Sequence, residues 1–372
     1  MANTPSTKRV LLGMSGGVDS STAAALLQQQ GYDVIGFTLN LRSQRRTDPA
    51  DPMRSGSQAV ADAEAVCQQL GIPHYQADKS ELFGREVIDY FVEEYRQGRT
   101  PNPCVLCNEK LKFSTLLARA DELGAGFIAT GHYARIEPAG DGQRFLLKRG
   151  RDAGKDQSYF LFSLKQHQLA RTLLPLGTAT KAETRQRARQ AGLKTSEKEE
   201  SMEICFVPDN DYGKFLTQSA GLSPHRGDIV DGSGRVLGRH DGIEFFTIGQ
   251  RKGIRVAHTH PLYVVDLDPV RNQVTVGPRK VLEKDRLIVG RCNWIAFDSP
   301  PSEFNALAQI RYRHPGAAAT VRLLSETEAE VRFLEPQRAI TPGQACVFYD
   351  GDTVLGGGWI QRDEAFHSAS PA

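Results

Sequence analysis

The sequence lacks an apolar run long enough to cross a membrane. No stretch approaches the roughly 20 residues that a bilayer-spanning helix needs. The opening segment, residues 1–9, is short and polar and leads straight into an apolar strand pattern. It leaves no room for a signal or transit peptide, so we expect a cytoplasmic protein with no membrane partner.

The sequence is also poor in cysteine and in net charge. Six cysteines in 372 residues are too few for a disulfide framework, and a reducing compartment would disfavour one. The 46 basic residues nearly balance the 44 acidic residues, which leaves a net charge of +2. Bulk charge therefore does not predict a nucleic-acid partner, and any such surface must be a local patch.

Strand and helix patterns alternate through the first half of the chain. Polar loops interrupt them at 42–57 and 99–108. The alternation predicts a doubly wound α/β domain with a parallel sheet. The expected strands are residues 9–14, 33–40, 72–77 and 126–130, and the expected helices are residues 20–30, 58–70, 81–97 and 109–123.

The pattern changes in the second half of the chain. A hairpin is expected at 134–150 and helices at 165–172 and 181–191; after about residue 222, short β-like runs separated by turns dominate. Regular turns between short strands are typical of barrels and small sheets. We therefore predict an α/β catalytic domain at 1–212, a small β-rich central domain at 213–282 and a C-terminal β-barrel at 283–372.

A glycine- and serine-rich segment joins the first expected strand to the first expected helix. It runs from Ser15 to Ser21 and contains Gly16, Gly17 and Asp19. Glycines let the backbone approach an anion, and a helix N-terminus offers unbonded N–H groups and a positive dipole end. The segment is not a Walker A loop, because no Gly-Lys-Ser/Thr follows and no lysine reaches the phosphates. We predict a phosphate loop here in preference to a plain Gly-Ser turn.

The pattern Ser-Gly-Gly-x-Asp-Ser-Ser resembles the loop of the ATP pyrophosphatases, which cut ATP to AMP and pyrophosphate. The resemblance implies a catalytic domain of that type. It also implies that the loop holds the departing pyrophosphate, together with magnesium.

Two cysteines lie close together in a proline-rich segment. Cys104 and Cys107 are expected in a loop before a helix, where the helix N-terminus would lower the thiol pKa and favour the thiolate. A structural zinc site, a thioredoxin-like pair and two core cysteines are the competing interpretations. The zinc site would need a second ligand pair at suitable spacing. Cys205 is either functional or a core residue on a short strand, whereas the remaining three cysteines are expected in the core: Cys67, Cys292 and Cys346.

Several segments together resemble the tRNA-specific 2-thiouridylase family, in the same order along nearly the whole chain. Any short one would be weak evidence, but eight in order leave little room for coincidence. The segments are Gly13 to Ser20, Thr100 to Asn108, Gly131 to Arg135, Lys155 to Leu161, Ile204 to Phe206, Phe246 to Gly253, Arg311 to Arg313 and Thr341 to Gln344.

The resemblance implies a role for each matching residue. Cys107 would be the nucleophile, and Cys205 would carry sulfur as a persulfide. ATP would be bound by Gly13, Met14, Ser15, Gly16, Gly17, Val18, Asp19, Ser20, Leu39 and Gly131. The target base would lie beside Asn102, Pro103 and Cys104, and the tRNA would contact His132, Lys155, Asp156, Gln157, Arg311, Tyr312 and Gln344.

The implied reaction is thiolation of carbon 2 of the wobble uridine in tRNA. ATP would adenylate the carbonyl oxygen, which is otherwise a poor leaving group, and two thiols would then divide the sulfur transfer. A sulfur-relay protein would supply the sulfur. RNA contacts are expected in separate patches, with candidate phosphate contacts at Arg251, Lys252, Arg311 and Arg313.

One position departs from the family pattern. Many members have an acidic residue where this chain has Cys104. Cys104, Cys107 and Cys205 could therefore hold an iron–sulfur cluster with one open iron, which would be an alternative sulfur route. Two other classes stay open: an amidating ATP pyrophosphatase with no essential cysteine, and a non-catalytic tRNA-binding or sulfur-carrier protein.

Overall fold

The computed structural model describes residues 6–41, 56–140, 142, 144–199, 204–207 and 211–362. The loop expected at 42–57 therefore lies almost entirely outside the described residues. The chain forms two compact units. The first comprises Met1–Val87, Cys104–Phe206 and Asp352–Val354, and the second comprises Ile88–Pro103, Val207–Gly351 and Leu355–Ala372.

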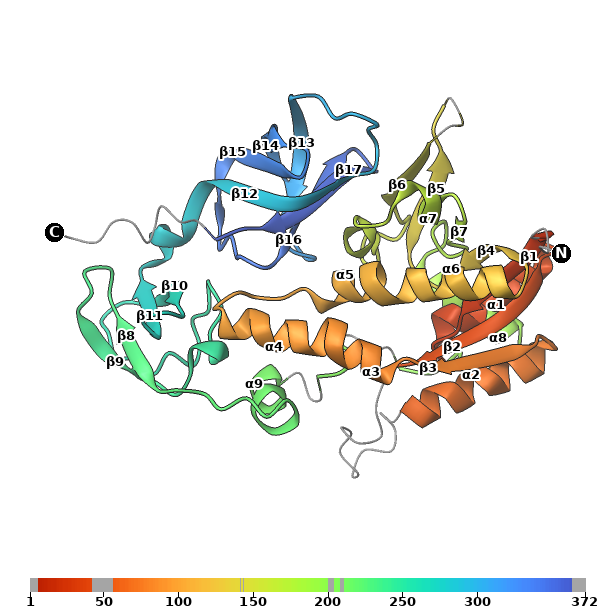
Figure 1. The fold of residues 1–372 in the computed structure, drawn as a ribbon, viewed down its shortest axis with the longest axis horizontal. Helices are drawn as coiled ribbons and strands as arrows, with labels where there is room; N and C mark the ends of the chain where they lie inside the picture. Colours follow the sequence, from red (N-terminus) through yellow and green to blue (C-terminus); the bar gives the residue numbers. More distant parts are fainter. Residues whose placement is uncertain are drawn as a thin grey trace. The chain divides into compact units, whose positions relative to one another are not determined.

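A five-stranded parallel sheet forms the centre of the first unit (Figure 1). Its order is β3-β2-β1-β4-β7, and every neighbouring pair runs parallel. The predicted doubly wound α/β domain is thereby confirmed. The strands are β1 (Ser6–Gly13), β2 (Asp33–Asn40), β3 (His74–Asp78), β4 (Ala125–Ala129) and β7 (Thr172–Leu173).

Helices cover both faces of this sheet because side chains alternate along each strand. Val10 and Leu12 face α1 (Val18–Gln29), α2 (Gly56–Leu70) and α8 (Lys181–Gln190) in one apolar core. Gly13 faces the opposite side, where a Cβ would lie 3.4 Å from Leu116 on α6 (Phe113–Glu122).

The helix expected at 81–97 comprises α3 (Ser80–Phe83), the π-helix η2 (Gly84–Ile88) and α4 (Asp89–Arg96). The loop expected at 99–108 is wrong over its second half. There, α5 (Pro103–Cys107) leads directly into the π-helix η3 (Asn108–Lys112) and then into α6. Proline is favoured at the first position of a helix because its φ is preset and its missing N–H is not needed. Pro103 therefore starts a helix here and does not extend a loop.

The expected hairpin is present as β5 (Ala134–Pro138) and β6 (Phe145–Arg149), paired antiparallel from Ala134–Arg149 to Pro138–Phe145. It is followed by the 3-10 helix η4 (Ser158–Leu161) and by α7 (Gln166–Leu169). Within the second unit, α9 (Tyr212–Lys214) runs into the π-helix η6 (Phe215–Ser219).

The second unit holds the β-rich part of the chain. One sheet has the order β10-β11-β8-β9, from β8 (Gly227–Val230), β9 (Val236–His240), β10 (Tyr263–Asp268) and β11 (Gln273–Gly277). Short 3-10 helices lie at η7 (Ile243–Phe245) and η8 (Arg279–Leu282).

The C-terminal strands follow the order β12-β15-β14-β13-β16-β17, and β12 also pairs with β17. That last pairing closes the strands into a barrel with its own apolar core, as predicted. The strands are β12 (Glu283–Trp294), β13 (Glu303–Gln309), β14 (Ala317–Ser325), β15 (Glu328–Arg338), β16 (Ala345–Asp350) and β17 (Thr353–Ile360). Across the described ranges, none of the helices combines the length and the apolar character that a membrane span needs.

Candidate functional site

The expected ATP-binding residues gather at the carboxyl edge of the parallel sheet. Gly13 ends β1, Leu39 lies at the end of β2, and Gly131 follows β4. The chain proceeds from β1 to β2 on one side, whereas β4 lies on the other side of β1. This is a topological switch point, where open α/β sheets bind their ligands.

The phosphate loop is held by its own serines. The Ser20 hydroxyl accepts a hydrogen bond from the Ser15 backbone N–H at 3.1 Å and lies 3.3 Å from the Gly17 carbonyl. The Ser21 hydroxyl donates to the same carbonyl at 2.8 Å. The helix N-cap, Gly17, has no side chain to cap α1. The N–H groups of the first turn therefore remain available to an anion.

Two glycines let neighbouring backbone approach this loop. Gly16 has φ +69°, and a Cβ on it would lie 2.4 Å from the Ala59 carbonyl oxygen of α2. A Cβ on Gly131 would lie 2.9 Å from the Ser20 backbone nitrogen. Neither position tolerates a side chain without backbone movement, and the loop is thus confined between α2 and the end of β4.

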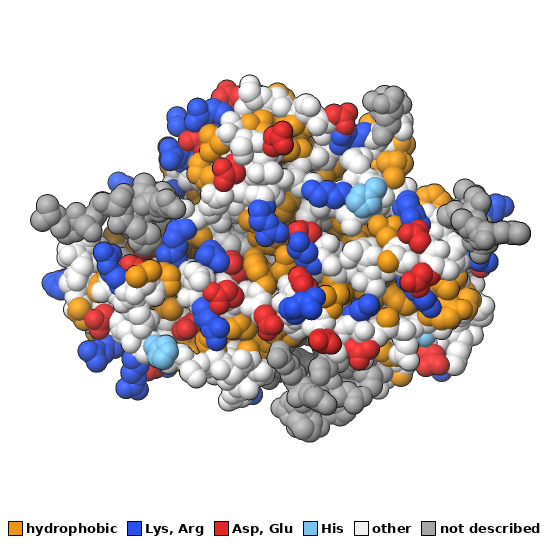
Figure 2. All heavy atoms as spheres, viewed as in Figure 1, with side chains coloured by type: hydrophobic (Ala, Val, Ile, Leu, Met, Phe, Trp, Pro, Cys, Tyr) orange, Lys and Arg blue, Asp and Glu red, His pale blue; other side chains and the backbone are white. Residues whose placement is uncertain are grey.

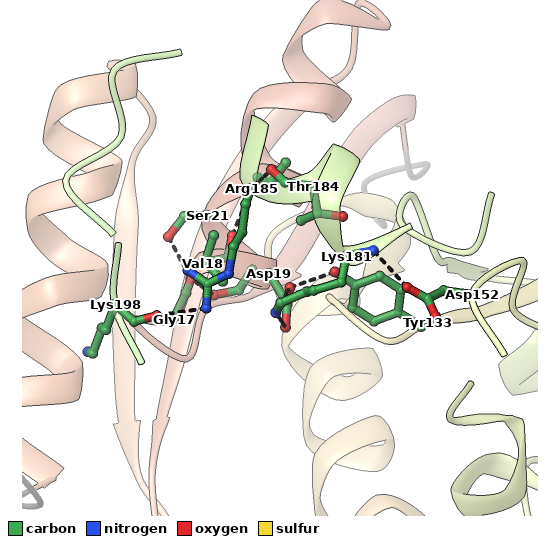
Figure 3. A network of polar contacts seen from close by, with 12 residues as sticks. Gly17, Val18, Asp19, Ser21, Tyr133, Asp152, Lys181, Thr184, Arg185 and Lys198 are labelled. Carbon is green, nitrogen blue, oxygen red and sulfur yellow. Dashed lines mark hydrogen bonds and ion pairs between the residues drawn. The ribbon is translucent and has the colours of Figure 1, made fainter. Parts of the chain in front are cut away.

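An unexpected cation lies on the phosphate loop. The Lys181 ammonium of α8 donates to both carboxylate oxygens of Asp19, at 2.7 and 2.9 Å. The Tyr133 hydroxyl donates to the same carboxylate at 2.8 Å, and both side chains point toward Asp19 in Figure 3. The loop has no lysine of its own, as a loop that is not a Walker A loop should, and this lysine comes from a distant helix.

A second lysine holds the other side of the loop. Lys198 donates to the Gly16 carbonyl at 2.9 Å and forms an ion pair with Asp62. In a trans peptide the C=O and N–H point in opposite directions, so this bond turns the Gly17 N–H away from Lys198. Burial acts to raise the pKa of Asp62, but the hydrogen bonds from Lys198 and Gln58 and the Lys198 charge outweigh it and lower that pKa.

The start of α8 is rigidly anchored. The Thr180 hydroxyl accepts from the Glu183 N–H, and the Glu183 side chain accepts from the Thr180 N–H at 2.8 Å, which completes a capping box. The Lys181 N–H donates to Asp152 at 2.8 Å. Arg185, one turn further on, donates to the Ser196 carbonyl at 2.7 Å. These bonds fix the base of the Lys181 side chain.

The three candidate cysteines lie near one another in the first unit. Cys107 is buried, Cys104 is half-buried and Cys205 is exposed, and none of them is in a disulfide. Burial raises the pKa of Cys104 to about 12, and the charge of Cys205 adds to this effect. Phe206, next to Cys205, packs edge-on against Phe83 with ring centroids 5.6 Å apart.

The expectation of a lowered thiol pKa at Cys107 was wrong. Cys107 lies beyond the first turn of the helical segment that starts at Pro103 and continues through η3, so it is not at the helix N-terminus where the dipole favours a thiolate. Burial instead raises the pKa of Cys107, and the nearby Lys112 ammonium opposes that rise. Cys205 lies in a turn, so the alternative of a core strand residue is also wrong for it.

Lys112 is a functional candidate that sequence reasoning missed. It ends η3, in which the Phe113 N–H donates to the Asn108 carbonyl five residues earlier. Lys112 itself lies five residues after Cys107, the spacing that a π-helix brings onto one face. Burial acts to lower the Lys112 pKa, but Cys107, Cys205 and Cys104 together raise it.

His132 connects the thiol region with the phosphate loop. Its Nδ1 lies 2.8 Å from the Thr130 hydroxyl, and its ring stacks on Phe113 with centroids 6.1 Å apart. Burial, aided by the Lys112 charge, lowers the pKa of His132 to about 3. The ring is therefore neutral at physiological pH. Its neighbour Gly131 contacts the start of α1, so consecutive residues reach both regions.

The segment Lys155 to Gln157 packs against the chain around His132 and holds it through hydrogen bonds. The buried Asp156 carboxylate accepts from Arg149 at 3.1 Å, from the Gly150 N–H at 2.9 Å and from the Ser158 hydroxyl at 2.9 Å. The Gln157 side chain accepts from the Tyr133 N–H at 2.9 Å. Asp156 and Gln157 thus hold the chain around His132, whereas the half-buried Lys155 lies at the surface of the same turn.

The remaining candidates lie in the second unit. Asn102 and Pro103 are buried. The Gln344 side chain donates to the carbonyls of Thr100 and Pro101, both at 3.1 Å, and so anchors the segment that leads to them.

The arginines expected to contact RNA phosphates lie at the surface of the same unit. Arg311 is exposed and Tyr312 half-exposed beside it; Arg251, Lys252 and Arg313 are also exposed. On the face shown in Figure 2, basic side chains are interspersed with acidic ones and do not form one continuous patch.

The other cysteines pack in apolar cores as predicted. Cys67 and Cys346 are fully buried, and Cys292 is 8% exposed. Among the residues that the structure describes, no three His, Cys, Asp or Glu side chains converge as a metal-ligand set.

Comparison with known proteins decides the family. The chain is 50% identical over 357 residues to tRNA-specific 2-thiouridylase MnmA of Geobacter metallireducens, which covers 95% of this chain and 96% of that protein. The enzyme of the same name from Moorella thermoacetica is 51% identical, over 94% of this chain and 99% of that protein. This chain belongs to the tRNA-specific 2-thiouridylase family.

Three family descriptions match successive parts of this thiouridylase-family chain. The tRNA methyl transferase HUP domain matches residues 8–209, the tRNA methyl transferase PRC-barrel domain 213–278 and the aminomethyltransferase beta-barrel domain 284–360. The order of an α/β domain, a small β-rich domain and a barrel agrees with the predicted fold class. The resemblance drawn from the sequence motifs is confirmed.

Proposed function

We propose that this chain activates the wobble uridine of tRNA with ATP and then replaces the oxygen at carbon 2 with sulfur. Family membership makes it a tRNA sulfurtransferase with an ATP-using domain. One observation carries the proposed mechanism: Gly131 contacts the phosphate loop, while the adjacent His132 is coupled to Lys112 beside the three thiols. Nucleotide activation and sulfur chemistry thus meet within one unit.

Activation comes first because the carbonyl oxygen is a poor leaving group. In the proposed step this oxygen attacks the α-phosphorus of ATP, and pyrophosphate departs into the loop from Ser15 to Ser20. Magnesium, held with the help of Asp19, would offset the phosphate charge. Gly13, Met14, Leu39 and Gly131 would line the nucleotide. The target uracil base would lie beside Asn102, Pro103 and Cys104. To enter this site it would leave the base stack of the anticodon loop.

Sulfur transfer uses two thiols in turn. A persulfide on Cys205, supplied by a sulfur-relay protein, attacks carbon 2 through its terminal sulfur and displaces AMP. The Cys107 thiolate then attacks the Cys205 sulfur, which forms a Cys107–Cys205 disulfide and leaves the sulfur on the base. Two electrons from an external reductant reset the thiols. Exposure suits Cys205 to accept sulfur, and the Lys112 charge favours ionised Cys107.

We also propose the division of labour along the chain. Residues 1–212 would form the catalytic domain, 213–282 a connecting domain and 283–372 an RNA-contacting barrel. His132, Lys155, Arg311 and Tyr312 would touch the tRNA, as would Asp156, Gln157 and Gln344 through the segments that they hold. The reaction would take place in the cytoplasm, where tRNA substrate is available.

The test uses the full chain purified anaerobically, unmodified tRNA, ATP and a persulfide donor. Nucleoside mass spectrometry measures 2-thiouridine, and a coupled assay measures pyrophosphate. We expect Cys107→Ser and Cys205→Ser to release pyrophosphate and make no thiouridine. Cys67→Ala removes a core thiol of the same unit and should retain both reactions.

Other outcomes point to other functions. Wild type and cysteine variants that all release pyrophosphate and make no thiouridine would favour an amidating enzyme, and absence of ATP turnover would favour a binding or carrier protein. Iron and sulfide in the pure protein, with activity lost in Cys104→Asp, would replace the two-thiol route by a cluster route. A colourless, active protein supports the two-thiol route.

A further inference from the structure

We propose that Lys181 is the phosphate-binding lysine of this site. Before the nucleotide binds, Asp19 holds the Lys181 ammonium group in an ion pair, which we call the reserve role of Asp19. The proposal rests on the proposed ATP-dependent function and assigns a residue to it. The loop from Ser15 to Ser21 has no lysine of its own. Lys181 brings an ammonium group to it from 162 residues further along the chain.

The position of the ammonium group fits this role. Asp19 lies in the first turn of α1, next to the N–H groups that would hold pyrophosphate. The Lys181 ammonium lies 2.7 Å from one oxygen of Asp19 and 2.9 Å from the other. A cation bound to Asp19 lies beside the first turn of α1. It is therefore within a small side-chain movement of an anion bound there.

The base of the Lys181 side chain is fixed, and its ammonium group lies at the end of a flexible stem. The Lys181 backbone is held by the capping box of α8 and by its bond to Asp152. The flexible four-carbon stem of a lysine leaves the head group mobile. Tyr133 keeps its hydrogen bond to Asp19 at 2.8 Å when the lysine leaves. The carboxylate then has one partner and can accept a metal ion.

Charge explains why the two residues are paired. A carboxylate in a phosphate loop repels a polyanion, and Lys181 neutralises it before the ligand binds. The Lys181 side chain is 11% exposed and that of Asp19 is 34% exposed, so water screens this pair only in part. Loss of Lys181 would remove an attraction to phosphate and also unmask the repelling carboxylate.

The first experiment compares Lys181→Met with Arg187→Met, which removes a positive charge from the exposed face of the same helix. Isothermal titration calorimetry on the full chain measures affinity for ATP, pyrophosphate and AMP. We expect Lys181→Met to weaken ATP and pyrophosphate binding roughly 10- to 100-fold, as for a lost charge-assisted hydrogen bond. AMP and tRNA affinity should stay within about twofold of wild type, as should all affinities of Arg187→Met.

A second variant tests the reserve role separately. With magnesium chelated, Asp19→Asn should bind pyrophosphate more tightly than wild type, because Lys181 is released and a negative charge is gone. Because loss of the carboxylate charge alone also raises affinity, the same substitution is made in Lys181→Met, where no lysine is released; the gain should be larger when Lys181 is present, and equal gains in the two backgrounds would overturn the reserve role. Weaker binding by Asp19→Asn under these conditions would overturn the reserve role.

The remaining outcomes separate this inference from the proposed function. Unchanged pyrophosphate affinity in Lys181→Met, with wild type still thiolating tRNA, would overturn the inference alone. Equal loss of AMP, pyrophosphate and tRNA binding would show a structural role and would also overturn it. A wild-type chain that binds no ATP and makes no thiouridine would overturn both.

Discussion

His132 should make the stability of the catalytic domain depend on pH in a way that one substitution removes. Burial and the Lys112 charge lower its pKa from 6.5 to about 3. Between these values the unfolded chain binds a proton at this residue and the folded chain does not. Linkage then requires stability to fall as pH drops below 6.5, because protons favour the state that binds them.

The size of the effect follows from the shift. At pH 5 the unfolded pKa lies about 1.5 units above the solution pH, and each unit is worth about 1.4 kcal/mol. His132 should therefore destabilise the fold by about 2 kcal/mol at pH 5 relative to pH 7.5. For a domain of about 200 residues this corresponds to roughly 4–8 °C in Tm.

Thermal unfolding of wild type and His132→Gln at both pH values measures this contribution. Burial also lowers the pKa of His74, His240 and His314, but their effect is common to both proteins and cancels in the difference. We expect Tm to fall less in His132→Gln than in wild type. The exposed His167→Gln variant should behave as wild type. Equal falls in wild type and His132→Gln would refute the reasoning.

Two further substitutions test the thiols and the loop. Lys112→Met should slow iodoacetamide alkylation of Cys107 about tenfold, because a neighbouring cation lowers a thiol pKa by roughly 1–3 units. Peptide mass spectrometry measures the alkylation rate. The control variant Lys110→Met, which removes an exposed lysine, should leave that rate unchanged. Gly131→Ala should weaken ATP binding about tenfold in calorimetry, because its Cβ would displace backbone that holds phosphate. Gly140→Ala, where a Cβ meets nothing within 4 Å, is its control; equal affinities in the two glycine variants would contradict the steric argument.

Local patterns in the sequence were enough to predict the sheet and the loop. The apolar run of β1 and the glycines after it define a strand, a turn and a helix start, and each feature depends on residues close together in the chain. The prediction of a loop at 99–108 was wrong over its second half, because a proline-rich segment is also compatible with the start of a helix. Pro103 instead takes the first position of α5, where its ring is favoured.

The two lysines could not be found in this way. Lys112 lies five residues from Cys107, a spacing that α-helical periodicity places on different faces and that only the π-helix η3 brings together. Lys181 begins a polar helix that carries four other charged residues, two of them exposed and two half-buried, so nothing local marks it. Its contact with Asp19 depends on the packing of α8 against α1, which the sequence pattern does not specify.

The close packing of the phosphate loop explains why its cation comes from elsewhere. Gly16 abuts α2 so closely that a Cβ would lie 2.4 Å from a carbonyl oxygen. Gly131 leaves as little space on the side of β4. A long side chain at Gly16 would push the loop away from its supports and misdirect the N–H groups of α1. A lysine on α8 avoids this conflict, because it reaches the open side of the loop while the backbone keeps its close contacts. Asp19, in the first turn of α1, holds that lysine beside the loop.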